Sequence, residues 1–423
     1  MTPIRKAATR PLSPPRAAPT QSSTGYQVGE SGYRRIAVAL FAAGVATFAL
    51  LHSTQALLPE LAHAFSISAT QSTLSLSLTT VGLGVTLLVA GPVSEVLGRT
   101  RLIHLSLTLS AVVGLACALA PTWHVLLGLR LLQGVTLAGL PAVATAYLRE
   151  ELHADTHARA AGLYIGGTAL GGMTGRLIAA AVADAAGWRW ALAAIAAVGL
   201  LSAAVALLTL PPSRNFVAAP ARIDHLTDMA RGAVADRGLL ALYVIGACSM
   251  GAFVAVYNAM DFRLTSAPFD LNAGIASLVF LVYPLGTVSS TLAGRLAERF
   301  SHRAVVPVGC LVTVAGVLLT LPGSLPVVVL GLAIMTVGFF AVHGVTSGWV
   351  PTRAHARGVA SGQAASLYLF AYYLGSSIFG SLAGRAWALG AWPAVTMLAL
   401  TLVIVSGLCA AYGVRSRRRS TSV

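Results

Sequence analysis

Charged residues are scarce in this sequence, and lysine is almost absent. Only 10% of the 423 residues are Asp, Glu, Lys or Arg, whereas 56% are hydrophobic. Soluble domains carry about 25% charged residues, so this chain has too little polar surface to cover a fold in water. The single lysine, Lys6, lies near the amino terminus, and the pattern GxxxxGK[ST] does not occur. These absences exclude a water-soluble protein and a P-loop ATPase, whose lysine must reach the nucleotide phosphates.

Cysteine is also rare and never paired. The four cysteines lie one by one inside apolar segments, without a CxxC motif: Cys117, Cys248, Cys310 and Cys409. This pattern predicts neither a disulfide framework nor a zinc site. His153 and His157 lie in a polar loop without the glutamate of an HExxH motif, so we expect no metal there. The sequence has no GxSxG motif and no paired catalytic carboxylates in its apolar segments, so it predicts neither an enzyme nor a bound cofactor.

Long apolar runs recur along the whole chain. A helix needs about 20 apolar residues to cross a bilayer, and twelve such runs are present: 36–58, 73–94, 102–120, 123–147, 159–182, 189–210, 239–262, 273–294, 304–321, 325–348, 358–384 and 391–413. The segments 1–35 and 416–423 are polar, and 1–35 lacks the apolar core of a signal peptide. The sequence therefore predicts an all-α integral membrane protein with twelve transmembrane helices and two polar tails, of which we expect 1–35 to be disordered.

The basic residues predict which side of the membrane each loop faces. The net charge is +15, yet the arginines stand singly or in small groups and form no basic domain, which argues against nucleic acid as a partner. Segments on the side of the amino terminus contain 23 of the 28 Lys and Arg. Loops rich in Lys and Arg stay in the cytosol. We therefore expect both termini in the cytosol, and the even number of spans agrees.

A short charged turn occurs twice, half a chain apart. Residues 91–101 read GPVSEVLGRTR, residues 294–303 read GRLAERFSHR, and their first glycines are 203 positions apart. Gly187-Trp188 and Ala391-Trp392 form a second matching pair, 204 positions apart. These matches indicate an internal repeat.

The longest internal polar stretch separates six spans from six. We therefore predict two six-helix pseudo-repeats, 36–212 and 239–415, joined by a cytosolic linker at 213–238. In proteins built this way the substrate site lies between the repeats, near the middle of the bilayer.

Both charged turns resemble the signature of the major facilitator superfamily, G-x-L-a-D-r-x-G-r-[kr]. The first copy has glutamate for aspartate and valine for leucine, and its matching residues are Gly91, Glu95, Gly98, Arg99 and Arg101. In the second copy serine replaces the second glycine, and the matching residues are Gly294, Leu296, Glu298, Arg299 and Arg303. The resemblance covers the chain from about residue 36.

Two further stretches look like the YnfM-type branch of this family, STQALLPELAHAF at 53–65 and GLYIGGTALGGMTGR at 162–176. That branch is similar to drug and metabolite proton antiporters of the bacterial inner membrane. The resemblance implies a secondary transporter in such a membrane, which moves a small molecule and protons. We expect it to act as a monomer.

The first charged turn also has a physical role of its own. Glu95 and Arg99 are four residues apart and can pair on one helix face where the second span leaves the membrane. Gly98 permits the sharp reversal of the chain, and Gly91 leaves space for a neighbouring helix. We predict that the turn latches the cytosolic side while the transporter is open outward. The alternative is a solvated loop whose charges only set topology.

Two arginines lie within spans, where a charge is costly and should face a wet cavity or a partner. Arg130 and Gln133 match the R-x-x-q-G pattern of the family's fourth span. The resemblance implies that Arg130 couples proton movement or binds an anionic group; an arginine that only reaches backbone carbonyls is the alternative. Arg176 stands where antiporters of the family have proline. We expect Arg176 to line the cavity and favour an anionic or zwitterionic substrate, or to snorkel to the interface.

The fifth span is rich in glycine. Gly162, Gly171 and Gly175 keep the spacing of the family's antiporters, although the missing proline counts against drug antiport. Gly167, Gly171 and Gly175 lie four apart and predict a seam for close helix packing.

Asp261, at the end of the seventh span beside Arg263, is interpreted as a solvated rim residue, with a proton-carrying acid as the alternative. Glu60 and Asp184 are interpreted as rim residues. Polar residues of the first, seventh, tenth and eleventh spans complete the predicted cavity, or else form ordinary interhelical hydrogen bonds: His52, Gln55, Tyr257, Asn258, His343, Gln363, Tyr368 and Tyr372. His52 and His343 are also candidates for proton exchange, because histidine titrates near neutral pH.

These features predict a proton-coupled exporter of small organic molecules that works by alternating access. A proton-coupled importer of a sugar or organic acid is the alternative, since it needs the same cavity and titrating group. A membrane-embedded enzyme would need a catalytic motif. A channel would need rings of like residues around a symmetric pore, and two pseudo-repeats suit rocking better.

Overall fold

The computed structural model describes residues 25–415 except 217–231, 233 and 360. In this part, eleven helices are long and apolar enough to cross a membrane. The last of them, α15 (Ser361–Arg415), contains two spans, because the backbone leaves the helical conformation at Gly390 and Ala391. The twelve transmembrane helices predicted from the sequence are therefore confirmed. The tail 416–423, and most of the other tail and of the linker, lie outside the described residues.

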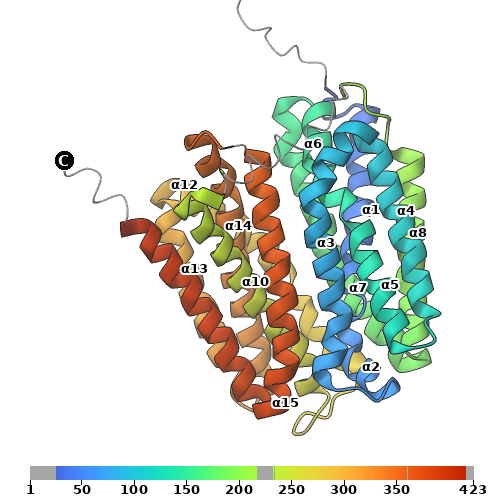
Figure 1. The fold of residues 1–423 in the computed structure, drawn as a ribbon, viewed down its shortest axis with the longest axis vertical. Coiled ribbons are helices and arrows are strands. Elements are labelled where there is room, and N and C mark those ends of the chain that lie inside the picture. Colours follow the sequence, from blue (N-terminus) through green and yellow to red (C-terminus); the bar gives the residue numbers. More distant parts are fainter. Residues whose placement is uncertain (1–24, 217–231, 233, 360, 416–423) are drawn as a thin grey trace, which may run out of the picture.

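The first six spans form one bundle, on the right in Figure 1. Its elements are α1 (Ser31–His52), η1 (Gln55–Leu57), α2 (Leu58–Ala64), α3 (Ala69–Leu97), α4 (Arg99–Ala118), α5 (Trp123–Leu137), α6 (Gly139–Glu151), η2 (Ala154–Thr156), α7 (His157–Ala186) and α8 (Trp188–Thr209). The first span is broken, since α1 passes through the 3-10 turn η1 into α2. The helices extend beyond the apolar runs because polar caps begin them; Ser68 and Gln71 form such a capping box at the start of α3.

The last six spans form the second bundle, on the left in Figure 1. Its elements are α10 (Arg237–Leu264), α11 (Ala273–Ser277), η3 (Leu278–Val282), α12 (Pro284–Phe300), α13 (His302–Leu319), α14 (Leu325–Ala356) and α15. The eighth span is broken in its outer part, where α11 and η3 precede α12. Pro284 explains the restart, because proline favours the first position of a helix and cannot continue one.

The two halves share their turn geometry as well as their helix count. Gly98, between the second and third spans, has φ 88° and ψ 148°, and Ser301, at the matching turn of the other half, has φ 100° and ψ 148°. Gly187 and Ala391 begin the sixth span of each half, with φ of 87° and 49°. These positive φ angles favour glycine, yet the second half uses serine and alanine. The repeat therefore keeps a positive φ at both turns even where its glycines are lost, and Gly98 and Ser301 share the whole conformation.

Three glycines bring α7 against α1. A Cβ atom at Gly167 would lie 2.4 Å from the carbonyl oxygen of Phe41, and one at Gly171 would lie 2.2 Å from that of Val45. At Gly175 it would lie 2.6 Å from the Cα of Ala49. Larger residues would therefore force these two helices apart. A Cβ at Gly162 would meet no atom within 4 Å, so the structure places that glycine outside the seam.

Candidate functional site

Arg130 is fully buried on α5 and binds the broken end of the first span. It donates hydrogen bonds to the carbonyls of Leu50 (3.1 Å), Leu51 (2.8 Å) and Ser75 (3.1 Å), to the Ser53 hydroxyl (3.1 Å) and to the amide oxygen of Gln133. Because α1 ends at His52, its last carbonyls lack helical partners. Arg130 therefore caps α1 and fixes the segment that leads to Gln55. This contact is the structural role that the sequence left as the alternative.

The segment after α1 carries the connection between the two halves. Gln55, fully buried on η1, accepts a hydrogen bond from Nε of Arg176 on α7 (2.7 Å). The amide nitrogen of Gln55 donates to Oδ1 of Asn258 on α10 (2.7 Å). Arg176 also donates to the carbonyl of Gly172 (2.5 Å) and is only 1% exposed, so it does not snorkel to an interface. One glutamine therefore joins a buried arginine of the first half to an asparagine of the second.

Asp261 lies one turn beyond Asn258 on α10 and is 4% exposed. The interpretation of Asp261 as a solvated rim residue is therefore wrong, because neighbouring helices bury it. Within the described residues its Oδ2 atom has no hydrogen-bond partner. Arg176 is the cation whose charge acts on it. The neighbouring Arg263 instead donates to the carbonyls of Thr320, Leu321 and Pro322.

Aromatic rings of the second half surround the arginine. The guanidinium of Arg176 lies 4.8 Å from the ring centroid of Phe280 and 4.7 Å from that of Tyr283. Tyr257 stacks on Phe280 at 5.4 Å and shares its hydroxyl with Thr336 (2.8 Å). Phe280 and Tyr283 were not among the predicted site residues. The proline that follows Tyr283 marks the break in the eighth span and could have identified them.

The remaining predicted residues form separate groups. His343 contacts the Tyr368 hydroxyl through Nδ1 (3.0 Å), and its ring lies 4.6 Å from that of Tyr372. His52 contacts the carbonyl of Phe48 (3.1 Å), away from this pair. Gln363 lies half-buried at the start of α15. The structure therefore brings Gln55, Tyr257, Asn258, Asp261 and Arg176 together, and places the other candidates around or apart from them.

Hydroxyl groups join α3 to the first part of α15. Ser377 and Thr80 share a hydrogen bond of 2.6 Å, and Ser377 also donates to the carbonyl of Ser77 (2.9 Å). Ser381 donates to the Ser77 hydroxyl (2.8 Å). These residues could not be predicted, because serine and threonine recur on both helices without a distinctive spacing.

All hydrogen bonds between the halves in the described residues lie away from the chain ends. They comprise the Gln55 connection, the hydroxyl contacts of α3 with α15, and a bond from the backbone N–H of Gly274 to the Asp184 carboxylate (2.6 Å). Asp184 is exposed, as expected of a rim residue, and Glu60 is half-buried and accepts from the backbone N–H of Trp188 (2.8 Å). The halves are thus joined on the side opposite the chain ends, and Figure 1 shows the bundles diverging toward the ends.

The first charged turn forms a network within its own half. Arg99 pairs with Glu95 (2.5 Å) and with Glu150 at the end of α6 (3.1 Å), and it also donates to the Ser94 hydroxyl. Its guanidinium lies 5.4 Å from the ring centroid of Phe216, at the start of the linker. In this conformation the turn therefore binds the linker and makes no described contact with the other half.

The second charged turn differs from the first. Glu298 and Arg299 are exposed, and Arg299 lies over the ring of its neighbour Phe300 (5.3 Å). No ion pair of Glu298 occurs within the described ranges. The equivalent network therefore does not form around this copy, in keeping with its departure from the signature.

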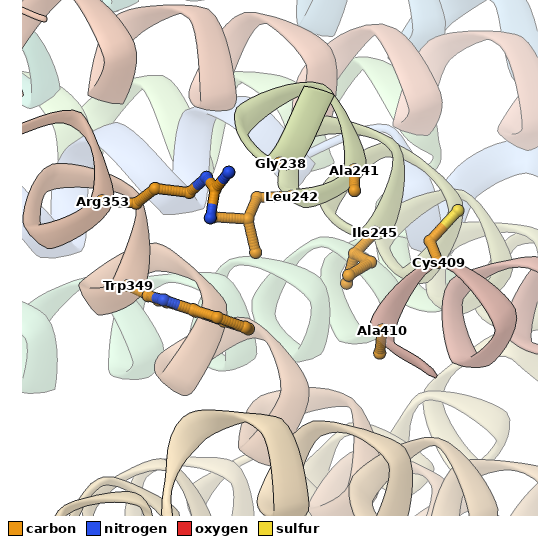
Figure 2. A pocket seen from close by; sticks show the side chains of 8 residues that line it. All are labelled: Gly238, Ala241, Leu242, Ile245, Trp349, Arg353, Cys409 and Ala410. Carbon is orange, nitrogen blue, oxygen red and sulfur yellow. The ribbon is translucent and has the colours of Figure 1, made fainter. Parts of the chain in front are cut away.

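In the second half, an ion pair joins the start of α10 to the end of α14. Asp236 caps α10 through the backbone N–H of Leu239 (2.7 Å) and accepts from Nε of Arg353 (2.7 Å). Burial alone would raise the pKa of Asp236, but the bonds from Arg353 and Leu239, with the charge of Arg357, bring it below its ordinary value of 3.8. A pocket of about 20 Å³ beside this pair is lined mainly by apolar side chains, among them Trp349 (Figure 2). It is too small for an organic substrate and lies far from Arg176 along the helices, so it is not the candidate site.

Comparisons with known proteins agree with this architecture. Residues 36–375 match the model of the Major Facilitator Superfamily. The chain belongs to that family. This major facilitator chain is 40% identical to the inner membrane transport protein YnfM of Escherichia coli, over 89% of the chain and 90% of YnfM. It is 38% identical to the uncharacterized MFS-type transporter YybF of Bacillus subtilis, over 90% of the chain and 95% of YybF.

Solved structures show the same fold at low identity. A bacterial homolog of the human lysosomal transporter Spinster, inward-facing and occupied, superposes with a TM-score of 0.73 at 16% identity, over 92% of the chain and 98% of the homolog. The xylose transporter XylE of E. coli, in a partially occluded inward open conformation, superposes with a TM-score of 0.68 at 15% identity, over 90% of the chain and 97% of XylE. The major facilitator chain is therefore a multi-pass membrane protein and a secondary transporter that works by alternating access.

Proposed function

We propose that this transporter couples protons to the movement of a small organic molecule across a bacterial inner membrane. It acts as a monomer that rocks 36–212 against 239–415, with both termini in the cytosol. The concentration of Lys and Arg on the side of the termini supports this orientation. With that orientation, the described contacts correspond to a state closed toward the outside.

The observation that carries the proposal is the buried connection Arg176–Gln55–Asn258 beside Asp261. Its members come from both halves, so rocking must break the bond between Gln55 and Asn258 (2.7 Å). An acid that is 4% exposed must lose or gain its proton when the surroundings change, because a charge is costly in a dry interior. Asp261 is therefore the proposed proton carrier, and its protonation is linked to the state of the connection.

Export is the first candidate for direction, supported by the resemblance to the YnfM-type branch. Uptake of an organic acid is the second, and one observation favours it. Arg176 has no carboxylate within ion-pairing distance in the described residues, whereas exporters of cationic drugs need negative charge in the site. The two directions share the same coupling acid.

Everted membrane vesicles test the proposed coupling. A proton gradient is established, a pH-sensitive dye reports it, and compounds that stabilise the purified protein are added. An antiported substrate releases the gradient, and Asp261→Asn abolishes the release without abolishing binding. The matched control is Asp155→Asn, because that carboxyl lies exposed on the short 3-10 helix η2. If no stabilising compound moves protons in everted or right-side-out vesicles, proton coupling is refuted.

A further inference from the structure

A buried arginine without an anion needs an explanation. Arg176 is 1% exposed, and the groups that accept its hydrogen bonds, the side-chain oxygen of Gln55 and the carbonyl of Gly172, are both neutral. Two hydrogen bonds leave three of its five N–H donors for another acceptor. A buried cation without a counterion is strongly destabilising, and neutral acceptors offset only part of this cost.

The surroundings of Arg176 favour a planar cation yet leave polar atoms unsatisfied. The rings of Phe280 and Tyr283 flank the guanidinium and attract it through their faces. Two buried oxygens near this cluster have no partner among the described residues: Asp261 Oδ2 and the Tyr283 hydroxyl. Buried polar groups are normally hydrogen-bonded, so this group of atoms indicates a site that is completed by a ligand.

We infer that the transported molecule is an organic anion whose carboxylate or phosphate binds the free N–H groups of Arg176. This inference rests on the proposed transport function and names its substrate class. Arginine presents a planar fork that fits such anions with two parallel hydrogen bonds. The hydroxyl of Tyr283, beside the guanidinium, donates a further bond to the same anion. Because the guanidinium is occluded here, the anion reaches it only after side chains or the two halves move.

Asp261 determines when Arg176 can take this anion. Asp261 makes no ion pair with Arg176, but when it is ionised its negative charge acts on the guanidinium and repels an incoming anion. A proton on Asp261 removes that negative charge, so the anion and the proton bind together and reinforce each other. Both then cross in the same direction, which favours the second candidate, uptake of an organic acid. One coupled proton lowers the apparent affinity tenfold for each pH unit above the pKa of Asp261.

Few other titratable groups face Asp261. Arg176 comes from α7, Tyr283 from the start of α12, and Tyr257 from one turn earlier on α10 itself. His52, at the end of α1, also feels the charge of Arg176. Arg263 is engaged by carbonyls of the loop after α13. The two tyrosines stay neutral near pH 7, so His52 is the group whose own titration must be separated from that of Asp261.

The test uses the full chain, purified and reconstituted in lipid nanodiscs. A panel of matched triplets is added, in which one aromatic or aliphatic frame carries a carboxylate, a carboxamide or an aminomethyl group. Thermal stabilisation and proton uptake from a weakly buffered solution are measured between pH 5 and 9. We expect carboxylates alone to stabilise the protein, with about one proton taken up for each anion bound and the tenfold pH dependence given above.

Variants assign the effect to residues. Arg176→Gln should weaken carboxylate binding at least a hundredfold, while Arg176→Lys keeps part of it and shows that the fold survives. Asp261→Asn should bind carboxylate with little pH dependence and without proton uptake. His52→Gln should keep the pH dependence and the proton uptake of the unchanged chain. Stabilisation by amides or amines, no stabilisation by any carboxylate, or undiminished binding in a folded Arg176→Gln would each overturn the anion site.

The outcomes also separate this inference from the proposed function. Carboxylate binding that depends on Arg176 but moves no protons in vesicles would leave the anion site standing and refute proton coupling. Proton-coupled flux of an amine would leave the transport function standing and refute the anion site.

Discussion

Ser301 offers a direct measure of strain in the second half, because the first half holds glycine in the same conformation. Ser301 has φ 100° and ψ 148°, close to the 88° and 148° of Gly98. A side chain in this sparsely populated region costs about 1–3 kcal/mol. Glycine loses more backbone entropy on folding, about 0.4–1 kcal/mol. Ser301→Gly should therefore stabilise the protein by about 1 kcal/mol.

The reverse change is the matched control. A Cβ at Gly98 would meet its nearest atom, in the ring of Phe216, at 3.7 Å, which is ordinary contact. Gly98→Ser therefore introduces backbone strain without a clash and should destabilise by about 1–3 kcal/mol. The Ser301 side chain is exposed, so its removal loses no packing.

Unfolding in mixed detergent and SDS micelles, followed by tryptophan fluorescence, gives the free energy of each variant. Ser301→Gly should move the midpoint to higher SDS and Gly98→Ser to lower SDS. A neutral or destabilising Ser301→Gly, together with a neutral Gly98→Ser, would show that the turn relaxes at no cost. The claim that Ser301 is strained in the conformation that it shares with Gly98 would then be abandoned.

Four further changes test other contacts. The double variant Ser77→Ala, Ser377→Ala removes three hydrogen bonds between α3 and α15, each worth about 0.6 kcal/mol. Thiol labelling of positions on the outer side should then rise on the order of tenfold. Unchanged labelling would show that these bonds do not hold the outer side closed. Arg130→Lys should lower the thermal midpoint and slow transport, whereas an unaltered midpoint would contradict the capping of α1. Glu95→Gln should slow the exchange between outward-open and inward-open states more than it weakens substrate binding. An effect on substrate affinity alone would refute the predicted role of this turn as a latch. Asp236 has a lowered pKa when folded, so its stabilisation is present above pH 3.8 and is lost as the pH falls through the folded value; Asp236→Asn should flatten that acid loss in thermal-shift measurements.

The sequence predicted the fold better than it predicted the site. Twelve spans follow from apolar runs, since a bilayer imposes both their length and their composition. The charged turns at 91–101 and 294–303 correctly indicated the repeat. Helix ends were less certain, because polar caps such as Ser68 extend helices beyond the apolar residues. The broken eighth span was also missed, although Pro284 marked it.

The site required facts that a sequence does not contain. Gln55 and Asn258 were candidates, but their contact depends on the rotation of η1 and α10 about their axes. Asp261 lies near the end of its apolar run, which indicates a rim position, yet the fold leaves it only 4% exposed. Spacing along one helix predicts which side chains share a face. It does not predict which face another helix will cover.

The broken helices explain how groups of the two halves come into contact. The first span stops at His52, and the segment that follows turns Gln55 toward the second half; the eighth span is interrupted before Tyr283, which reaches Arg176 of the first half. Discontinuous helices expose backbone and side-chain groups that a continuous helix would keep to itself. Arg130 satisfies the freed carbonyls of α1, so the first break is stable without a ligand. The second break ends instead in an unsatisfied tyrosine hydroxyl.

We therefore expect substrate to act on the eighth span first, because a bound anion supplies the missing hydrogen-bond partner there, as Arg130 already does for α1. Hydrogen exchange with and without a stabilising carboxylate should show greater protection at 278–284 than at 53–57, and the opposite order would show that the first break moves instead.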